Sequence, residues 1–408
     1  MNGQEVWLDE HEVGWLKPAE PPLFSLAYLE RWTSEVLAFP LAPSLPMPPR
    51  GGPGSESTSD AVPAFFDHLL PSGRARTRIF SALGLRPDDS FGALRLMGRD
   101  LPGAVRLIAD GLPRPAGPVQ RLVSQAELSE RLRQRDETPF AVWDGQVRGA
   151  LAGDRDQLAV YVERDGGWYL ADGPQMASTH VLTPAPAAHA WDAAGSRPDP
   201  LFDEFFCMRL AARVGLDVAP VQLYHVPEPV LLIERFDRER LDDGRVRRPH
   251  AINACQALGV TVADQDEVSL PQLFSLLAQS PAPLVDSRAL LRWTLFRQLI
   301  GSDGSGAAQA SFFIDHGGLR VAPAHGLVSG SARAFDAEAW RRFAKDADIA
   351  PRSIALEMKR LCEAVLAQAS VLADELASEL PRPAIDGLLG RLLDESERQA
   401  ALAPEIAR

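Results

Sequence analysis

The hydrophobic pattern of this 408-residue chain changes near residue 253, and the change restricts the fold classes that the chain can adopt. Before residue 253, apolar residues stand in short runs separated by Asp and Gly, as in residues 158–162, which is typical of strands. After it, apolar residues recur at helical spacing, most clearly in residues 290–300. Strands followed by helices favour an α+β fold over a doubly wound sheet, in which the two element types would alternate.

Turn-forming residues divide the chain further and predict individual elements. Residues 5–16 carry two apolar runs around a charged turn and predict a hairpin, whereas the Pro-, Gly- and Ser-rich residues 41–60 predict a mobile loop. Residues 61–85 predict helices with a break at Pro71, and residues 201–214 predict another helix. Further strands are expected at residues 140–143, 168–170, 180–182, 221–224, 229–236 and 311–314, and further helices at residues 337–380 and from 386 onward.

These elements predict three parts in the chain. A mixed N-terminal subdomain is expected over residues 1–110, a strand-rich lobe with one helix over residues 111–240, and a mostly helical lobe over residues 241–408. No internal repeat is visible in the sequence, which excludes a solenoid or propeller architecture.

Charge and composition exclude several classes of protein. The formal net charge is −13, with 55 acidic against 42 basic residues, so the chain has no general attraction for a nucleic-acid backbone and would need a basic patch or a basic partner to contact DNA. The sequence has no apolar run long enough for a membrane span, and its first residues lack the pattern of a signal peptide. Three widely spaced cysteines form neither a disulfide framework nor a zinc motif, so we expect a cytoplasmic protein.

Lysine is scarce in this chain, which limits the chemistry available to it. Among the 42 basic residues only Lys17, Lys345 and Lys359 are lysines, and the others are arginines. No lysine therefore lies between Lys17 and Lys345 for a reaction that requires a compact ammonium group.

Residues 149–153, Gly-Ala-Leu-Ala-Gly, lie between expected strands and allow two interpretations. Their backbone amides could cradle a phosphate, with Arg155 beside them to hold an anion, or the segment is an ordinary hairpin. Residues 234–238, Glu-Arg-Phe-Asp-Arg, follow a very apolar strand, and strands commonly end in charged residues. In neither segment does the spacing alone distinguish a functional role from a structural one.

Residues 300–314 predict a helix, a small-residue loop and a strand, a geometry that often presents catalytic groups. Asp303 is the only ionisable residue between residues 301 and 310, and it is either a base or a turn-forming residue. His325 either faces a cleft or is a plain loop histidine, and the eight histidines form no zinc motif. No Gly-x-Ser-x-Gly nucleophile signature occurs, so spacing alone leaves the function open.

Taken in order, segments along nearly the whole chain resemble the HipA family, the bacterial toxin kinases of type II toxin–antitoxin operons. Residues 96–105 are similar to the family's G-x-D-x-x-G-A signature, and residues 234–238 match a further family segment, of which residues 234–236 correspond to the adenine-binding hinge. Other similar segments are the N-terminal hairpin and residues 64–71, 150–153, 178–182, 203–211, 255–259, 299–301 and 322–323. The resemblance implies a protein-kinase-like bilobal fold with an extra N-terminal subdomain.

The resemblance also implies a function and a set of site positions. Active members of the family phosphorylate serine on a translation factor, and they bind a small helix-turn-helix antitoxin that docks the pair on operator DNA. In this chain the family's autophosphorylated loop serine falls on Ala150, its loop lysine on Gln157, and its phosphate-pairing lysine on Thr183. Neither Gln157 nor Thr183 carries the positive charge that the resemblance leads us to expect.

The positions that handle the proton and the metal in the family are substituted as well. Its D-x-H-x-x-N motif places the base on Gly304, the histidine on Gly306 and the metal-binding asparagine on Gln309, and its second metal aspartate falls on Gly326. Phosphoryl transfer depends on these charges. Their joint loss indicates a pseudokinase, for which we expect no catalytic residues, no metal site and no cofactor.

The leading hypothesis is a HipA-like pseudokinase that binds a small helix-turn-helix antitoxin-like partner, reaches DNA only through that partner, and has no membrane association. The alternative is an active, divergent serine/threonine kinase or another ATP-dependent transferase that uses ATP and Mg²⁺, with Asp303 replacing the lost base. Weak nucleotide binding is expected at Gly153, Arg155, Glu234 and Phe236, because backbone contacts at a hinge do not require the lost side chains.

Overall fold

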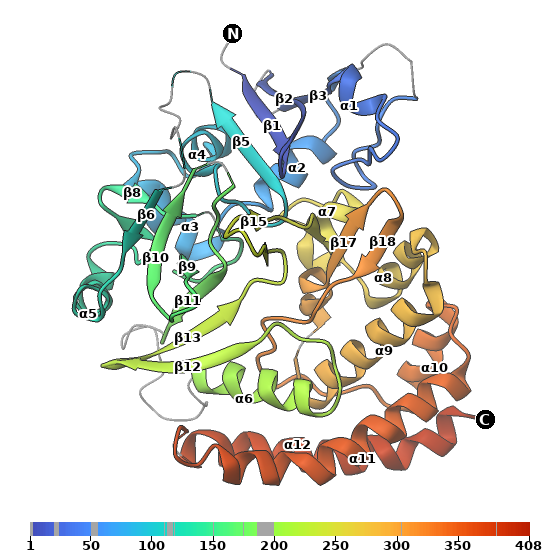
Figure 1. The fold of residues 1–408 in the computed structure, drawn as a ribbon. Helices are drawn as coiled ribbons and strands as arrows, with labels where there is room; N and C mark the ends of the chain where they lie inside the picture. The colour runs from blue at the N-terminus through green and yellow to red at the C-terminus, as the bar shows by residue number, and fades with distance from the viewer. Residues whose placement is uncertain are drawn as a thin grey trace. The chain divides into compact units, whose positions relative to one another are not determined.

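The computed structural model describes residues 3–19, 24–49, 56–109, 111, 117, 119–149, 151–173, 175–185, 200–302, 304–380 and 382–408. Contacts within the chain define two compact units. The first unit comprises Met1–Pro184, Tyr224–Gln265 and Phe312–Gly317, and the second comprises Ala185–Leu223, Asp266–Ser311 and Gly318–Arg408. The elements of both units are labelled in Figure 1.

The first unit opens with a five-stranded sheet in the order β4-β3-β2-β1-β5. Its strands are β1 (Gln4–Leu8), β2 (His11–Pro18), β3 (Phe24–Tyr28), β4 (Glu56–Ser57) and β5 (Val105–Ala109). Strands β1 and β2 form the predicted hairpin, in which Gln4 pairs with Leu16 and Leu8 pairs with His11. Burial alternates along β1 and β5, as expected for strands that cover a core with one face.

Short helices accompany this sheet, namely α1 (Glu30–Thr33), α2 (Ala61–Asp67), α3 (Gly73–Ala82) and α4 (Ser90–Met97). The predicted break near Pro71 is confirmed, because α2 ends before it and α3 begins after it. The prediction of a mobile loop over residues 41–60 is wrong for its first residues. Leu41 and Leu45 are buried, and the Tyr28 hydroxyl accepts a bond from Leu41 N and donates one to Leu45 O, each 2.9 Å long. The buried phenol of Tyr28 thus bonds to both ends of residues 41–45.

The second sheet of this unit has the strand order β12-β13-β11-β9-β10-β6. Its strands are β6 (Val119–Leu122), β9 (Leu158–Val162), β10 (Trp168–Asp172), β11 (His180–Pro184), β12 (Val221–Val226) and β13 (Glu228–Glu234). Strand β11 is central and antiparallel to both neighbours, so that Leu182 lies between Leu232 of β13 and Leu158 of β9. The predicted strands at residues 158–162, 168–170, 180–182 and 229–236 are confirmed.

One face of this sheet packs against α5 (Gln125–Arg133), which is followed by η1 (Gln134–Asp136) and the hairpin of β7 (Val142–Trp143) and β8 (Gln146–Val147). The shared core contains Val123, Leu128, Leu132, Phe140, Trp143, Leu158, Val160, Leu170, Leu182, Val226, Val230 and Leu232. Because side chains alternate between the two faces of a strand, Thr183 and Gln157 belong to the opposite face.

The first unit also contains β14 (Glu239–Arg240), β15 (Val246–Arg247), β16 (Ala251–Asn253), α7 (Ala254–Leu258) and most of β17 (Ser311–Asp315). Helix α7 begins with a reciprocal cap, in which Asn253 accepts from Gln256 N and the Gln256 side chain accepts from Asn253 N. It ends at Gly259, which has a left-handed φ of 73°. Strand β17 is tied to this region by a 3.0 Å bond from Ile314 N to His250 O.

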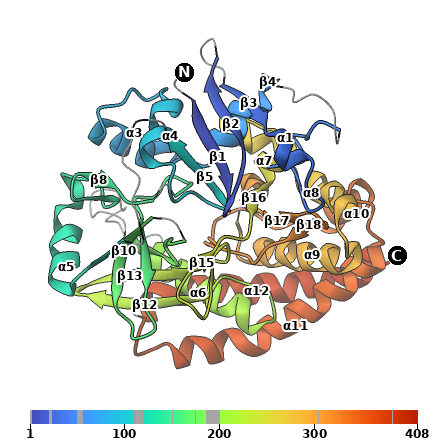
Figure 2. The same ribbon diagram turned by 45° about the horizontal axis from the view of Figure 1, so that its top comes forward.

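The second unit is mostly helical. Its helices are α6 (Pro200–Arg213), α8 (Leu270–Leu276), η4 (Leu277–Gln279), α9 (Pro283–Leu299), η5 (Gly304–Gln309), α10 (Ala337–Asp346), α11 (Pro351–Glu375) and α12 (Arg382–Ile406). The short helix η3 (Gln265–Glu267) lies at the border between the two units, and strand β18 (Gly318–Val321) belongs to the second unit. The long helices α11 and α12 run side by side in both views (Figures 1 and 2). Trp340 of α10 donates a 2.9 Å bond to Gln399 of α12, and Arg213 of α6 donates a 2.8 Å bond to Gln368 of α11.

The arrangement agrees with the predicted mixture of strands and helices. Every strand pairing with a described register is antiparallel, and the long helices belong to a separate unit, which is the α+β pattern rather than a doubly wound sheet. The predicted helix over residues 201–214 is confirmed as α6, and the expected small-residue loop at residues 301–310 contains the short helix η5. Across the described part of the chain, no helix has both the length and the apolar character that crossing a membrane would require.

Candidate functional site

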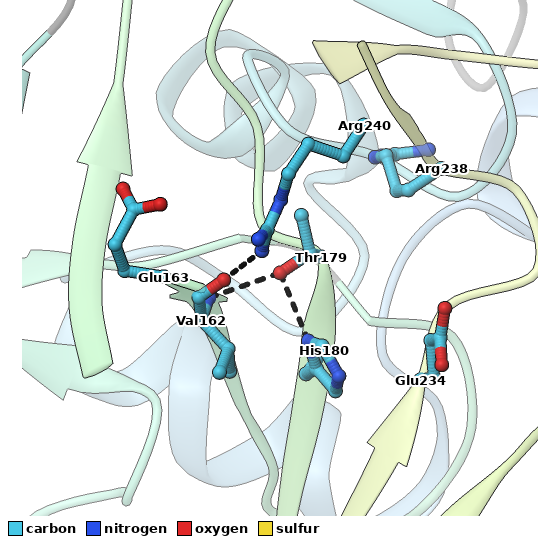
Figure 3. A pocket seen from close by; sticks show the side chains of 7 residues that line it. All are labelled: Val162, Glu163, Thr179, His180, Glu234, Arg238 and Arg240. Carbon is cyan, nitrogen blue, oxygen red and sulfur yellow. Dashed lines mark hydrogen bonds between the residues drawn. The ribbon is translucent and has the colours of Figure 1, made fainter. Parts of the chain in front are cut away.

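An open, polar cavity of about 330 Å³ lies at one end of the six-stranded sheet of the first unit (Figure 3). It is lined by Val162, Glu163, Thr179, His180, Glu234, Arg238 and Arg240. His180 of β11 pairs directly with Glu234 of β13, which brings both residues to the same end of the sheet. The register of the sheet therefore builds this cavity from residues that are far apart in the sequence.

The surroundings of the cavity histidine determine its charge. The Thr179 hydroxyl accepts a 3.0 Å bond from Val162 N and lies 2.9 Å from His180 Nδ1. Burial lowers the pKa of His180 to about 4, and the positive charge of Arg240 adds to this shift. Arg240 in turn donates to Val162 O, as drawn in Figure 3. His180 is therefore neutral at physiological pH.

The cavity contains one of the four residues expected to bind nucleotide. Glu234 lines it, whereas Gly153, Arg155 and Phe236 are not among its lining residues. Phe236 instead packs edge-on against Phe313 of β17, with their ring centroids 5.8 Å apart. Of the four expected residues, Glu234 is therefore the one that lines this particular cavity.

The loop at residues 149–157 is anchored at both ends. Gly149 has a φ of 75°, and a Cβ at this position would lie 2.6 Å from Ala159 Cβ, so the close approach to β9 requires glycine. Gly153 O accepts a 2.8 Å bond from Ser72 N. Asp156 accepts from Phe140 N over 2.7 Å and from Ala141 N over 3.2 Å. Ala150, the expected position of the autophosphorylated serine, lies outside the described residues.

The loop ends at a polar contact between the two positions where the resemblance places lysines. Gln157 Nε2 donates a 2.6 Å hydrogen bond to Thr183 Oγ1, and Thr183 is 2 % exposed. Both partners are uncharged, so this contact supplies no cation for a phosphate group. Lys17, the lysine of the first unit, lies 3.5 Å from Glu56 in the N-terminal sheet.

The two sequence segments that most resemble family signatures are joined by a buried ionic network. Arg238 lies 2.8 Å from Asp100 and 3.0 Å from Asp237, and Arg235 lies 2.8 Å from Asp237. Gly103 N donates to Asp237 over 2.6 Å. Burial alone would raise the pKa of Asp100 and of Asp237, but the neighbouring guanidinium groups outweigh it and hold both pKa values well below their usual range.

This network gives residues 234–238 a structural role. Arg235 Nη2 and Arg238 Nη2 both donate to Leu101 O, over 3.0 Å and 2.7 Å, and Arg238 Nη1 donates to Gly103 O over 2.8 Å. Gly103 has a φ of 69°, and a Cβ there would overlap Ala251 O. A structural role therefore accounts for Arg235, Asp237 and Arg238 without any ligand.

The positions expected for the base and the metal ligands lie in the second unit. Gly304 begins η5, Gly306 is buried within it, and Gln309 ends it, while Asp303 lies outside the described residues. Gln309 Oε1 accepts a 3.0 Å bond from Arg297 Nη1. Gly326 has a φ of 60°, and a Cβ there would meet no atom within 4 Å. Within the described residues, no three His, Cys, Asp or Glu side chains are grouped as metal ligands.

Other polar residues near this loop have structural partners. Asp203 of α6 accepts a 2.7 Å bond from Ser329 N and a second bond from the Ser329 hydroxyl. Burial raises the pKa of Asp203, although these two bonds oppose the shift. His325 Nε2 lies 2.9 Å from the Ser311 hydroxyl. These contacts tie the chain after β18 to α6 and to the start of β17.

Sequence reasoning missed Arg297 and Asp100 as organising residues. Asp100 lies in a segment that resembles a family signature, and Arg297 lies in an apolar helix, so neither attracts attention by itself. A weak signal exists for Arg297, since it is a charged residue near the end of that helix, four positions before the small-residue loop begins at Gly301. Neither residue's partners follow from local spacing, because Asp100 and Arg238 are 138 positions apart.

Comparison with known proteins gives consistent matches over both units. Residues 4–108 match the HipA N-terminal domain, and residues 149–376 match the HipA-like C-terminal domain. The chain is 28% identical over 343 residues to a serine/threonine-protein kinase toxin HipA of Shewanella oneidensis, covering 80% of this chain and 74% of that protein. It is 31% identical over 373 residues to the putative kinase Y4mE of Sinorhizobium fredii, covering 84% of this chain and 85% of that protein.

A solved structure shows the same fold. The chain superimposes on Shewanella oneidensis HipA, solved in complex with HipB and its operator DNA, with a TM-score of 0.80 and 24% identity over 99% of each chain. This similarity confirms the mixed α/β architecture. Together with the two domain matches, it establishes that this chain belongs to the HipA family.

Proposed function

We propose that this chain is a HipA-family pseudokinase that acts by binding a protein partner and transfers no phosphoryl group. The observation that carries the proposal is the neutral hydrogen bond between Gln157 and Thr183, at the two positions where the family is expected to hold lysines. An uncharged amide–hydroxyl pair neutralises no phosphate charge.

The physical argument concerns charge. Phosphoryl transfer requires cations on the phosphates, a carboxylate that receives the hydroxyl proton, and oxygen ligands for Mg²⁺. Glycine at positions 304 and 326 supplies neither a base nor a metal ligand, and the Gln309 oxygen already accepts from Arg297. Each lost group of this kind typically costs several kcal/mol of barrier, on the order of 3–4 kcal/mol for one preorganised donor. The expected kinase-like bilobal layout, with parts over residues 1–110, 111–240 and 241–408, remains part of this proposal.

The proposed partner is a small helix-turn-helix protein of the antitoxin type. Support comes from the Shewanella oneidensis relative, whose solved complex contains HipB and operator DNA. With a net charge of −13, this chain is electrostatically suited to a basic DNA-binding partner and unsuited to direct contact with phosphates. DNA is therefore reached through the partner.

The second candidate function is an active kinase. It is favoured by the relative named a serine/threonine-protein kinase toxin and by Glu234, whose segment remains at the edge of a polar cavity. In this alternative, ATP and Mg²⁺ bind and Asp303 serves as the base.

A phosphotransfer assay on the purified chain separates the two functions. The chain is incubated with ATP and Mg²⁺, and intact-mass and peptide mass spectrometry record any added phosphate. We expect none, and no stabilisation by ATP that depends on Mg²⁺ in a thermal-shift titration. ATP-dependent labelling that disappears in Asp303→Ala would replace the proposal by the kinase alternative.

Partner binding is tested separately by co-purification from the native host. We expect a small protein with a helix-turn-helix sequence, encoded beside this chain, to co-purify at a fixed stoichiometry. The complex should shift an operator fragment in a gel, whereas the chain alone should not. A chain that shifts DNA by itself would contradict the proposed route to DNA.

A further inference from the structure

Two residues of the polar cavity lie on the opposite face of the six-stranded sheet from Thr183. Leu182 and Leu232 belong to the hydrophobic core on the α5 side of this sheet. His180 and Glu234 are two positions away from them along the same strands, and because side chains alternate across a strand, they share that face. Both cavity residues therefore face away from the position at which the family resemblance places a phosphate-pairing lysine.

Arg240 brings to the cavity a positive charge that no acidic side chain balances by an ion pair. Its Nη2 donates to Val162 O, and its Cζ lies 5.0 Å from the centroid of the Tyr161 ring. Throughout the part of the chain that the structure describes, no carboxylate forms an ion pair with Arg240. Its charge acts inside the cavity, where it contributes to the lowered pKa of His180. The guanidinium of Arg240 is thus suited to an anion that comes from outside the chain.

Arg238 and Arg240 each keep one hydrogen-bond donor without a partner. Both residues line the cavity, and the Nε atom of each is buried yet bonded to no acceptor. Arg238 is 8 % exposed, and its Nη atoms donate to Asp100, Leu101 O and Gly103 O. Buried polar groups in proteins are almost always paired. Two unpaired donors on residues of one cavity therefore indicate an acceptor from a ligand, and a carboxylate is the acceptor that pairs especially well with guanidinium groups.

Carboxylates line the other part of the cavity. Glu163 and Glu234 lie on either side of His180 in Figure 3. The charge of Arg238 is balanced in its network of two arginines and two aspartates, and His180 is neutral. The two glutamates against the one guanidinium of Arg240 leave the lining with a net charge of −1. The cavity therefore suits a ligand that carries one anionic group and an excess of positive charge.

We propose that this cavity binds a free α-amino acid with a basic side chain, whose carboxylate pairs with Arg240 and whose positive groups lie towards Glu163 and Glu234. The volume of about 330 Å³ is in the range of small-ligand sites. The neutral ring of His180 offers a hydrogen bond without adding a charge. The site uses neither Gln157 nor Thr183, so it does not depend on whether the chain transfers phosphate.

Isothermal titration calorimetry on the full wild-type chain tests the proposed ligand class, with L-arginine as the probe. We expect a Kd of about 1 mM or lower. Agmatine, which lacks the carboxylate, and L-glutamate, which carries a net negative charge, should each bind at least about tenfold more weakly. Equal affinity of either analogue, or no measurable binding of L-arginine, would overturn the proposal.

Substitutions test the residues. Arg240→Met keeps an apolar stem beside Tyr161 and should weaken the binding of L-arginine at least about tenfold. Glu234→Gln, at an exposed position, should weaken it at least about threefold. The matched control is Arg247→Met on the neighbouring strand β15, which does not line the cavity and should leave the affinity unchanged. Thermal unfolding verifies that each variant folds. If Arg240→Met does not fold, Glu234→Gln decides the test, and an unchanged affinity in the folded variants would overturn the proposal.

A competition titration separates this site from a nucleotide site. ATP with Mg²⁺ should not displace L-arginine, because His180 and Glu234 face away from Thr183. Displacement by ATP would overturn the proposal, since the cavity would then be part of a nucleotide site. Phosphotransfer by the chain without displacement would end the pseudokinase proposal and leave the amino-acid site supported.

Discussion

The side-chain amide of Gln157 and the hydroxyl of Thr183 share a 2.6 Å hydrogen bond, although the two residues are 26 positions apart in the chain. Gln157 precedes β9, Thr183 lies on β11, and the antiparallel pairing of these strands brings them together. The contact places one neutral hydrogen-bonded pair where two positive charges are expected. Substitution at either position therefore changes packing and charge together.

Thr183→Lys should destabilise the chain without creating a nucleotide site. Thr183 is buried and bonded to Gln157, and placing an ammonium group there costs desolvation energy, so the free energy of unfolding should fall by about 2 kcal/mol or more. Urea denaturation followed by tryptophan fluorescence measures the loss. Thr183→Val is the control and should cost only about 1 kcal/mol, the value of one hydrogen bond. A Thr183→Lys chain that is as stable as the wild type and is further stabilised by ATP would contradict the prediction.

Arg238→Ala should be among the most destabilising single substitutions in the first unit. It removes the partner of Asp100 and a bond to Leu101 O, and it leaves buried carboxylates with less compensation, which typically costs about 3–5 kcal/mol. The matched control is Arg247→Ala, whose ion pair with Glu239 lies on the surface and should contribute less than about 1 kcal/mol. Comparable losses for the two variants in urea denaturation would show that the buried network is not the main anchor.

The stability of the chain should fall as pH is lowered from about 7 toward 4, partly because of His250. Its Nδ1 accepts from Ala104 N and its Nε2 lies 2.8 Å from Leu41 O, which requires a neutral ring. Burial lowers the pKa of His250 to about 4. The unfolded chain takes up this proton near pH 6.5, whereas the folded chain takes it up only near pH 4. The free energy of unfolding therefore falls by up to about 1.4 kcal/mol for each pH unit between about 6.5 and 4.

The measurement is the slope of the unfolding free energy against pH between about 6 and 4.5. His250→Gln should reduce this slope by up to the contribution of one proton, about 1.4 kcal/mol per pH unit. Identical slopes for the wild type and His250→Gln would refute the assignment. Asp100 and Asp237 act in a lower range: their depressed pKa values add stability above about pH 4, which is lost as pH falls further.

Gly149→Ala should destabilise the chain more than Gly166→Ala does. Both glycines have a positive φ, 75° and 87°, so both substitutions carry the same backbone strain of about 1–2 kcal/mol. A Cβ at Gly149 would lie 2.6 Å from Ala159 Cβ, whereas one at Gly166 meets no atom within 4 Å. Because of this close approach, Gly149→Ala should lower the free energy of unfolding by about 1–3 kcal/mol more than Gly166→Ala does. Thermal or urea unfolding measures the difference. Equal costs would mean that the loop moves away from β9 easily.

Local pattern predicted the elements well where apolar periodicity and turn residues agreed. The N-terminal hairpin, the break at Pro71 and helix α6 are all present at the predicted positions. The loop prediction for residues 41–60 failed at Leu41 and Leu45, because a single distant phenol, Tyr28, anchors a stretch whose composition is typical of loops. Composition reports the average tendency of a segment and carries no information about one long-range hydrogen bond.

The sequence by itself determined the α+β class, the order of the elements and the absence of charged residues at Gln157, Thr183, Gly304, Gly306 and Gln309. These properties follow from residue identity and local periodicity. Only the tertiary structure decided that Gln157 bonds to Thr183, that Asp100 pairs with Arg238, and that Arg297 bonds to Gln309. Each of these contacts depends on how whole elements pack, since hydrogen bonds and steric overlap act over a few ångströms in space irrespective of separation along the chain.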